Sequence, residues 1–240
     1  MRRRLRQLSS DESGFTLPEL LTAIVIGMVV LMAAFMLLDR TVASTARVSD
    51  RQEAVQRGRL TMELMTRQLR SQVCLADDTP ILAGDDSSVT FYANLSSNPN
   101  SAQKRALRYV ASEKRIYEDV YNGTGTYPAL TFPASPTTSK ELLRPVAQAD
   151  EKVGSTMVTR PIFRYYRYAP ATTTGALQQL TSPLTATTAA QVVMINVAFA
   201  ALPIRKVERT TDVKDATTFA SDVYVRLADP TKPTEGPACL

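Results

Sequence analysis

The amino-acid sequence predicts an α+β protein in which one long N-terminal helix packs on an antiparallel β-sheet. Residues 20–38 are almost all apolar and carry no charge. Residues 39–73 contain no proline, and apolar residues recur there on one helical face. Beyond Cys74 the chain becomes rich in Thr, Pro, Ser and Gly, and apolar and polar residues begin to alternate. These three observations predict a helix with two different halves, followed by a β-rich domain.

The apolar run is long enough to cross a membrane as a helix. Its 19 residues, 20–38, would rise about 28 Å, close to the thickness of the hydrocarbon core of a bilayer. Four arginines precede it, at positions 2, 3, 4 and 6, and basic flanks remain in the cytoplasm. We therefore expect a single transmembrane segment at 15–38, with the C-terminal part of the chain outside the cytoplasm.

Residues 39–74 are predicted to continue the helix as an amphipathic half. Its apolar stripe consists of Val55, Met62, Met65, Leu69 and Val73. Glu63 and Arg67 stand at i and i+4 in the favourable orientation for an ion pair. Gly58 is the one glycine of this half and is expected to permit a bend. The stripe would pack under the domain that follows.

The remaining residues, 75–240, are predicted to form the β-rich domain, with a sheet of five to seven strands. Alternating patterns place strands at 88–93, 104–111, 115–121, 162–168, 193–199 and 223–227. The second and third of these read as a hairpin. Residues 122–160 and 170–190 are predicted to be loops with short structured pieces, and 203–218 a long exposed loop. Burial on one face only is typical of an antiparallel sheet, and the helical stripe would cover that face.

The composition excludes several kinds of active site. The chain has no histidine, which excludes Ser-His-Asp and Cys-His nucleophiles and His-ligated zinc. It has no phosphate-binding glycine motif, and its two cysteines are too few for an iron–sulfur cluster. The net charge is +5; residues 1–14 carry four arginines and two acidic residues, so the rest carries +3. That charge gives no support for nucleic-acid binding. We expect no cofactor, no metal and no catalytic site.

The boundary between the basic leader and the apolar run carries a specific pattern. It reads Gly14, Phe15, Thr16, Leu17, Pro18, Glu19, Leu20, Leu21. This pattern resembles the prepilin signal shared by type IV pilins and pseudopilins. The resemblance implies that residues 1–14 are a leader, that prepilin peptidase cuts between Gly14 and Phe15, and that the new amine of Phe15 is methylated. Pro18 agrees with this, because proline is tolerated in the first turn of a helix.

Two other interpretations of this boundary stay open. A secretory signal peptide has an apolar region of about 7–15 residues followed by small residues, whereas this run is longer and Asp39 and Arg40 follow it. An ordinary uncleaved membrane anchor is the second.

Glu19 is the one carboxylate at the edge of the apolar run. The resemblance implies that it pairs with the N-terminal amine of Phe15 on a neighbouring subunit in a filament. A charge in this position is unfavourable without a partner. The alternative is that Glu19 lies among lipid headgroups or interacts with the helix dipole.

Cys74 and Cys239 are the two cysteines. Outside the cytoplasm a disulfide is their expected state, and it would tie the C-terminal tail to the end of the helix. The alternatives are two unpaired thiols, or one buried and one exposed.

Two further groups suggest ligands only weakly. The acidic doublets at 77–78 and 85–86 lie near a helix end, but their spacing matches no EF-hand. Tyr165, Tyr166 and Tyr168 beside Arg164 and Arg167 suggest stacking on a sugar or a base, and an ordinary strand with one aromatic face explains them as well.

The rest of the chain resembles the PilW-like minor pilins and the J-type pseudopilins of type II secretion. The matching segments are residues 57–60 (Arg-Gly-Arg-Leu), 69–74 (Leu-Arg-Ser-Gln-Val-Cys), 88–92 (Ser-Val-Thr-Phe-Tyr) and 163–166 (Phe-Arg-Tyr-Tyr). This implies a minor pilin-like subunit that helps to prime or cap a filament. Its partners would be prepilin peptidase, other pilins, an inner-membrane assembly platform and membrane lipid. It would reside in the cytoplasmic membrane and, after assembly, at the cell surface or in a filament.

Three alternatives remain beside this function. One is a type II secretion minor pseudopilin. Another is a binding module or adhesin at a pilus tip. The third is an enzyme on a pilin-like stalk, for which the sequence shows no catalytic constellation.

Overall fold

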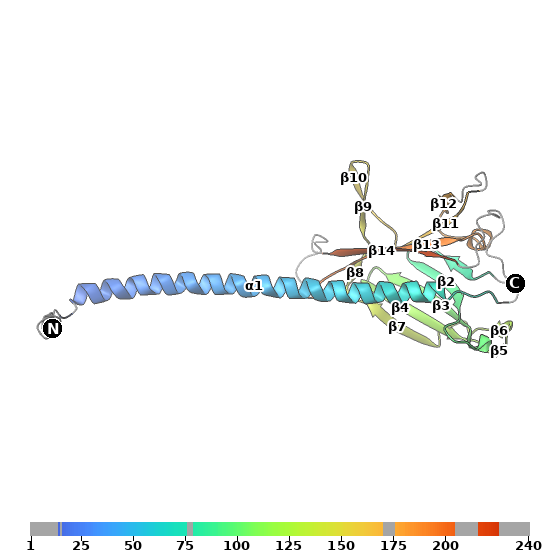
Figure 1. Ribbon diagram of the computed structural model, residues 1–240, viewed down its shortest axis with the longest axis horizontal. Helices are drawn as coiled ribbons and strands as arrows, with labels where there is room; N and C mark the ends of the chain where they lie inside the picture. Colours follow the sequence, from blue (N-terminus) through green and yellow to red (C-terminus); the bar gives the residue numbers. More distant parts are fainter. Residues whose placement is uncertain (1–13, 15, 76–78, 170–175, 205–215, 226–240) are drawn as a thin grey trace, which may run out of the picture. The chain divides into compact units, whose positions relative to one another are not determined.

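The computed structural model describes residues 14, 16–75, 79–169, 176–204 and 216–225, and the statements below concern these residues (Figure 1). The chain divides into two compact units, residues 1–49 and 50–240, which are described separately. Helix α1, Leu17–Arg70, contributes residues to both.

The first unit consists of the N-terminal part of α1. The carbonyl of Thr16 accepts hydrogen bonds from the N–H groups of Glu19 and Leu20, at 3.0 and 3.1 Å, and so opens the first helical turn. All side chains at 16–45 are exposed. One 18-residue window of α1 has a mean hydropathy of 2.8, and none of it is buried. By length and composition this is the one described helix that can cross a membrane, as the sequence predicted.

The second unit begins with the rest of α1, whose buried face is only partly the predicted one. Its buried residues are Ala54, Gly58, Thr61, Met65, Gln68 and Leu69. Met65 and Leu69 are buried as expected, whereas Val55 and Met62 are only half-buried. Small and polar residues take their place because α1 approaches its neighbours closely there.

Helix α1 ends at Arg70, four residues before the predicted end at Cys74. The Val73 N–H donates to the carbonyl of Tyr92 at 3.1 Å, and the Asn94 N–H donates to the carbonyl of Ser71 at 2.9 Å. These bonds are of the kind that joins β-strands, and they occupy the Val73 N–H and the Ser71 carbonyl, which a longer helix would use for its own hydrogen bonds. The helical period of residues 71–74 in the sequence is therefore overridden by the neighbouring strand.

The first sheet is an antiparallel meander in the order β1-β2-β3-β4-β7. Its strands are β1 Ile81–Gly84, β2 Ser88–Ala93, β3 Gln103–Val110, β4 Arg115–Asn122 and β7 Thr138–Leu143. The predicted hairpin is confirmed, since β3 and β4 pair from Gln103↔Asn122 to Val110↔Arg115.

The second sheet has the order β12-β11-β13-β14, and β8 pairs with β13 beside this path. Its strands are β8 Val146–Ala147, β11 Phe163–Tyr168, β12 Leu177–Gln179, β13 Met194–Ala201 and β14 Thr217–Tyr224. In β14, Val223 is buried while Asp222 and Tyr224 are exposed, as predicted. Positions 226 and 227 of that prediction lie outside the described residues.

The expectation of a single sheet was wrong. Besides the two larger sheets there are two hairpins, β5 Thr124–Thr126 with β6 Ala129–Thr131, and β9 Asp150–Val153 with β10 Thr156–Thr159. A 3-10 helix, η1 Pro99–Ser101, and a short helix, α2 Ala186–Ala189, complete the elements of the described ranges. Most hairpin side chains are exposed, so no apolar alternation marks these strands in the sequence.

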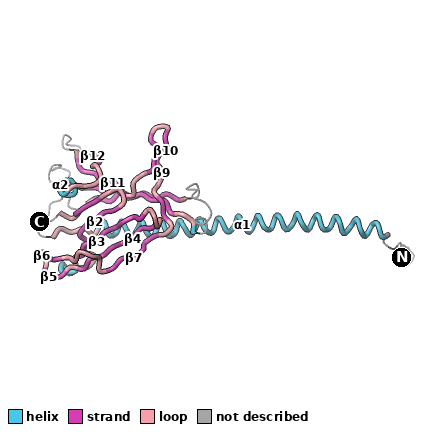
Figure 2. The backbone as a smooth tube through the Cα atoms, turned by 180° about the vertical axis from the view of Figure 1, so that it is seen from behind, coloured by secondary structure: helices cyan, strands magenta, loops and turns pink. Residues whose placement is uncertain are grey.

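The second unit has one main hydrophobic core, to which α1 and both larger sheets contribute. Figure 2 shows the C-terminal part of α1 running among the strands of this unit. Met65 and Leu69 supply the helical side, Phe91 and Leu107 the first sheet, and residues of β11, β13 and β14 the second. This is the α+β architecture that the sequence predicts, a long helix packed against antiparallel sheets.

Candidate processing and assembly site

The residues of the predicted cleavage site lie just before α1. Gly14 is exposed and non-helical, and a side chain built on it would have nothing within 4 Å. Phe15 lies outside the described residues, so its predicted methylation stays a prediction, as does cleavage between the two residues. The described part of the site presents an accessible segment next to a helix start. A peptidase needs such access to the bond it cuts.

Pro18 and Glu19 both fit the first turn of α1. Pro18 is its second residue, where a missing N–H removes no intrahelical hydrogen bond. Glu19 places a carboxylate in the same turn, at the positive end of the helix dipole. Within the described chain no salt bridge involves Glu19. The predicted pair with the amine of a neighbouring Phe15 remains a prediction.

The apolar residues that follow are exposed around the whole helix. Fifteen large hydrophobic side chains between positions 17 and 38 are 48–74% exposed: Leu17, Leu20, Leu21, Ile24, Val25, Ile26, Met28, Val29, Val30, Leu31, Met32, Phe35, Met36, Leu37 and Leu38. Exposing so much apolar surface to water is unfavourable by about 25 cal/mol per Å². A helix that is apolar on all sides is covered by lipid or by other apolar helices.

The model of the prokaryotic N-terminal methylation motif matches residues 9–35. The match covers the end of the leader, Gly14, Pro18, Glu19 and most of the apolar run. The comparison with curated proteins found no match.

This match supports a protein of the type IV pilin-like class, with a prepilin-type N-terminus. It implies processing by prepilin peptidase and association with other pilins. It indicates a structural subunit rather than an enzyme. Together with the apolar helix it also supports anchoring in a membrane.

The predicted disulfide involves one described residue. Cys74 is buried, with 9% of its surface exposed, and follows the segment that pairs with β2. Cys239 lies outside the described residues, so the pairing of the two cysteines stays a prediction.

The acidic doublet at 85–86 has a structural role. The Asp85 carboxylate accepts hydrogen bonds from the backbone N–H and the hydroxyl of both Ser87 and Ser88, at 2.6–2.9 Å. Burial alone would raise the pKa of Asp85, but these hydrogen bonds outweigh it and lower the pKa. Across the described ranges, no three His, Cys, Asp or Glu residues gather as a metal site would require. The doublet at 77–78 lies outside those ranges.

The tyrosines and arginines of β11 do not form one binding surface. Tyr165 is buried, with 1% of its surface exposed, and its hydroxyl lies 2.7 Å from the carbonyl of Ser88. Arg164 pairs with Glu151 at 2.5 Å, and this bond raises the pKa of Arg164. Arg167 donates to the side chain of Gln191 at 2.9 Å. These contacts favour the interpretation as an ordinary strand.

One polar cluster between α1 and the first sheet was missed by the sequence analysis. Gln68 donates to the carboxylate of Glu118 at 2.7 Å, and the same carboxylate pairs with Arg105. Glu118 is only 7% exposed. The signal was present, since Glu118 stands between Ile116 and Val120 on the apolar face of a predicted strand. A charge in that position indicates a buried partner.

Proposed function

We propose that this chain is a minor pilin-like subunit. After cleavage between Gly14 and Phe15 it inserts through the apolar part of α1 and helps to prime or cap a type IV pilus-like filament. The mature N-terminus would begin at a methylated Phe15. Glu19 would pair with the amine of the adjacent subunit, and the β-rich unit would lie outside the cytoplasm.

One observation carries this proposal. The methylation motif at 9–35 coincides with a helix whose apolar side chains are exposed on all sides. Such a helix needs a bilayer before assembly, and a filament of pilin-like subunits would supply other apolar helices after it. Membrane lipid, an inner-membrane assembly platform and other pilins are therefore the proposed partners.

The test is the intact mass of the protein isolated from membranes of cells with and without prepilin peptidase. We expect the mature protein to lack residues 1–14 and to carry one added methyl group, in peptidase-positive cells only. An uncut chain in both strains would overturn the proposal and leave an ordinary single-span anchor.

A matched pair of variants ties the result to the site. Gly14→Val should abolish cleavage, because it places a branched side chain next to the bond to be cut; a Cβ at position 14 has nothing within 4 Å among the described residues, so the fold should not be disturbed. Ser13→Val, one residue upstream, should still be cut. The processed protein is then sought in sheared surface filaments. Processing without any recovery there would favour the secretion pseudopilin and overturn the pilus assignment.

A further inference from the structure

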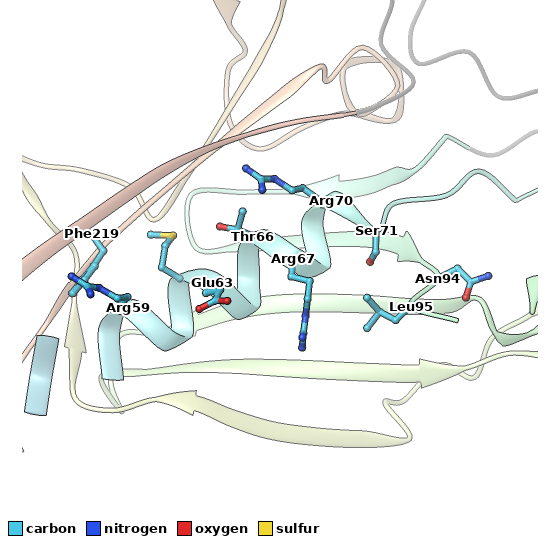
Figure 3. Close-up of a pocket in the computed structure, with 10 residues that line it drawn as sticks. Arg59, Glu63, Thr66, Arg67, Arg70, Ser71, Asn94, Leu95 and Phe219 are labelled. Atoms are coloured by element: carbon cyan, nitrogen blue, oxygen red, sulfur yellow. The ribbon is translucent and has the colours of Figure 1, made fainter. Parts of the chain in front are cut away.

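A groove runs along the C-terminal half of α1 within the second unit (Figure 3). Its volume is about 850 Å³. It is lined by Arg59, Met62, Glu63, Thr66, Arg67, Arg70, Ser71, Asn94, Leu95 and Phe219. Six of these residues come from α1 and Ser71 directly follows it; the other three come from the chain after β2 and from β14.

The groove is basic, and its charges are unpaired. Arg59, Arg67 and Arg70 line it together with one acidic residue, Glu63, which gives a net charge of +2. Among the residues that the structure describes, none forms a salt bridge or hydrogen bond with the guanidinium groups of these three arginines. The expected pair of Glu63 with Arg67 is also not formed; the ion pair of this spacing on α1 is Glu53 with Arg57, at 3.5 Å.

Most arginines elsewhere in the described part of the second unit differ in this respect; Arg51, which is exposed and lies outside the groove, is the exception. The other eight bond to a carboxylate, a carbonyl or a side-chain amide: Arg57, Arg105, Arg108, Arg115, Arg144, Arg160, Arg164 and Arg167. The groove therefore gathers guanidinium groups that the fold leaves free. Arg67 and Arg70 lie in the last turn of α1, where a positive charge interacts favourably with the helix dipole. Arg59 lies outside that turn, so the dipole does not explain its position.

The polar groups at the end of the groove are already engaged. The Ser71 hydroxyl donates to the carbonyl of Gln68 at 2.7 Å. The Asn94 amide donates to the carbonyl of Asn98 at 3.0 Å, and its oxygen accepts from the Ser96 N–H at 2.9 Å. The three guanidinium groups are thus the main free donors, so a ligand has to bring acceptors. Guanidinium binds carboxylate through two parallel hydrogen bonds.

The positive charges are spread along the groove. Arg59 and Arg70 are eleven residues apart, a rise of roughly 16 Å along the helix. In Figure 3 the side chain of Arg70 extends upward from the last turn of α1 and that of Arg67 downward. This spacing suits several separate carboxylates better than one compact anion. Met62 and the half-exposed Leu95 also line the groove and provide apolar surface for an aliphatic side chain.

Two features disfavour a nucleic acid. Glu63 places a negative charge among the arginines, where a phosphate backbone would be repelled. Phe219 packs against Phe199, with ring centroids 5.7 Å apart, and against Gly58, so its ring is engaged and is not a free surface for a base. Glu63 also repels an acidic peptide, but less than a phosphate backbone, because a peptide can place an uncharged residue beside that carboxylate.

We propose that this groove binds an acidic peptide segment of a partner protein, with carboxylates on Arg59, Arg67 and Arg70 and an aliphatic side chain against Met62 and Leu95. The proposal does not depend on cleavage after Gly14 or on filament assembly. Either can fail without the other.

The test is fluorescence anisotropy with the full-length chain in nanodiscs of neutral phosphatidylcholine. The probe is a fluorescein-labelled peptide in which glutamate and leucine alternate, and empty nanodiscs correct for binding to lipid. The comparison peptide has lysine in place of glutamate. We expect the acidic peptide to bind in a salt-dependent manner, and the basic peptide not to bind.

Charge variants locate the binding. Arg59→Glu with Arg70→Glu should weaken it about ten-fold, equivalent to about 1.4 kcal/mol. Leu95→Ser should weaken it, and Glu63→Gln should strengthen it, because the one repelling carboxylate is lost. Arg51→Glu, an exposed position of α1 outside the groove, is the matched control and should bind as the wild type does. All these side chains are exposed, so the fold should persist, which circular dichroism checks.

Three outcomes would overturn the proposal. The first is no binding of the acidic peptide. The second is binding that the charge variants do not change. The third is preferential binding of a single-stranded oligonucleotide that the acidic peptide cannot displace, which would make the groove a nucleic-acid site.

Discussion

The ring of Phe219 on β14 occupies the space that a side chain at position 58 of α1 would need. An ideal Cβ on Gly58 would lie 2.3 Å from Cε2 of Phe219. Phe219 in turn packs against Phe199, with 33° between the ring planes. The glycine in α1 therefore permits close approach of the helix to the second sheet. The sequence predicts that Gly58 permits a bend; the contact with Phe219 is a separate reason for a glycine at this position.

We predict that Gly58→Ala destabilises the protein. Alanine favours the helix by about 1 kcal/mol, but displacing an aromatic ring from a packed position costs about 1–3 kcal/mol. The free energy of unfolding should therefore fall by up to about 2 kcal/mol, measured by chemical denaturation of the full chain in detergent.

The effect of Gly58→Ala on the free energy of unfolding should change sign when the ring of Phe219 is absent. In a Phe219→Ala background, Gly58→Ala should raise the free energy of unfolding, because only its helix propensity remains. Equal effects in both backgrounds would show that the ring does not restrict position 58.

Tyr165 joins the two larger sheets through its hydroxyl. This group lies 2.7 Å from the carbonyl of Ser88 and 3.1 Å from that of Asp85, at the turn between β1 and β2. Tyr165→Phe should lower the free energy of unfolding by about 0.5–1.5 kcal/mol, the net contribution of one hydrogen bond, because the Ser88 carbonyl still accepts from the Asp85 N–H at 2.8 Å. Tyr224→Phe, at an exposed position, should have no measurable effect.

The pH dependence gives a second measure of the same residue. Burial raises the pKa of Tyr165 well above its ordinary value, and the nearby charges of Asp85 and Asp86 add to this. In the unfolded chain a tyrosine ionises near pH 10. Stability from Tyr165 is thus fully present below about pH 10 and is lost as the pH rises toward the folded pKa. The alkaline decline should be shallower in Tyr165→Phe; identical declines would contradict the assignment.

Glu118 is predicted to be the most sensitive charged residue of the first sheet. Its side chain is 9% exposed and that of its partner Arg105 is 11% exposed. Glu118→Ala would leave a buried arginine without a counter-charge and Gln68 without an acceptor, at a cost of about 3–5 kcal/mol. The measurement is the midpoint of denaturant unfolding.

Two controls distinguish the cost of leaving a buried charge unpaired from the cost of losing an ordinary ion pair. Glu118→Gln retains an acceptor for Gln68 and should cost less than the alanine variant. Glu53→Ala removes the exposed pair with Arg57 and should cost less than about 1 kcal/mol. A similar cost for Glu53→Ala and Glu118→Ala would argue against the buried network.

Glu19→Gln tests the proposed assembly contact. The variant should be cut and methylated normally, since the cleavage site lies outside α1. Its recovery in sheared filaments should fall by about ten-fold or more, which requires a loss of only about 1.4 kcal/mol. Asp39→Asn, at another exposed carboxylate of α1, is the control. Normal incorporation of Glu19→Gln would contradict the salt bridge.

The sequence predicted those parts of the fold whose periodicity is set by a large apolar face. The apolar half of α1, the β3–β4 hairpin and the burial of Ile195 and Val197 belong to this group. Helix end and strand number were less predictable. Residues 71–74 keep a helical period, yet they pair with the end of β2, a long-range contact that local pattern does not encode.

The candidate sites likewise include one that the sequence could locate and one that it could not. Gly14, Pro18 and Glu19 form a compact local pattern, so sequence alone located them. The groove at Arg59 and Arg70 is assembled from three separate segments of the chain. The groove arginines can be recognised as unpaired only when the bonds of the other arginines in the second unit are known. No local sequence pattern carries that information.

Met65 and Leu69 give the last two turns of α1 contact with the core that both larger sheets share. Tension transmitted along α1 would therefore reach the β-rich unit at several side chains simultaneously, and these contacts would be loaded in shear. Contacts sheared in parallel divide the load, whereas contacts peeled one after another each bear all of it. The embedded helix end is thus a mechanically strong attachment for a subunit that is pulled by its N-terminus.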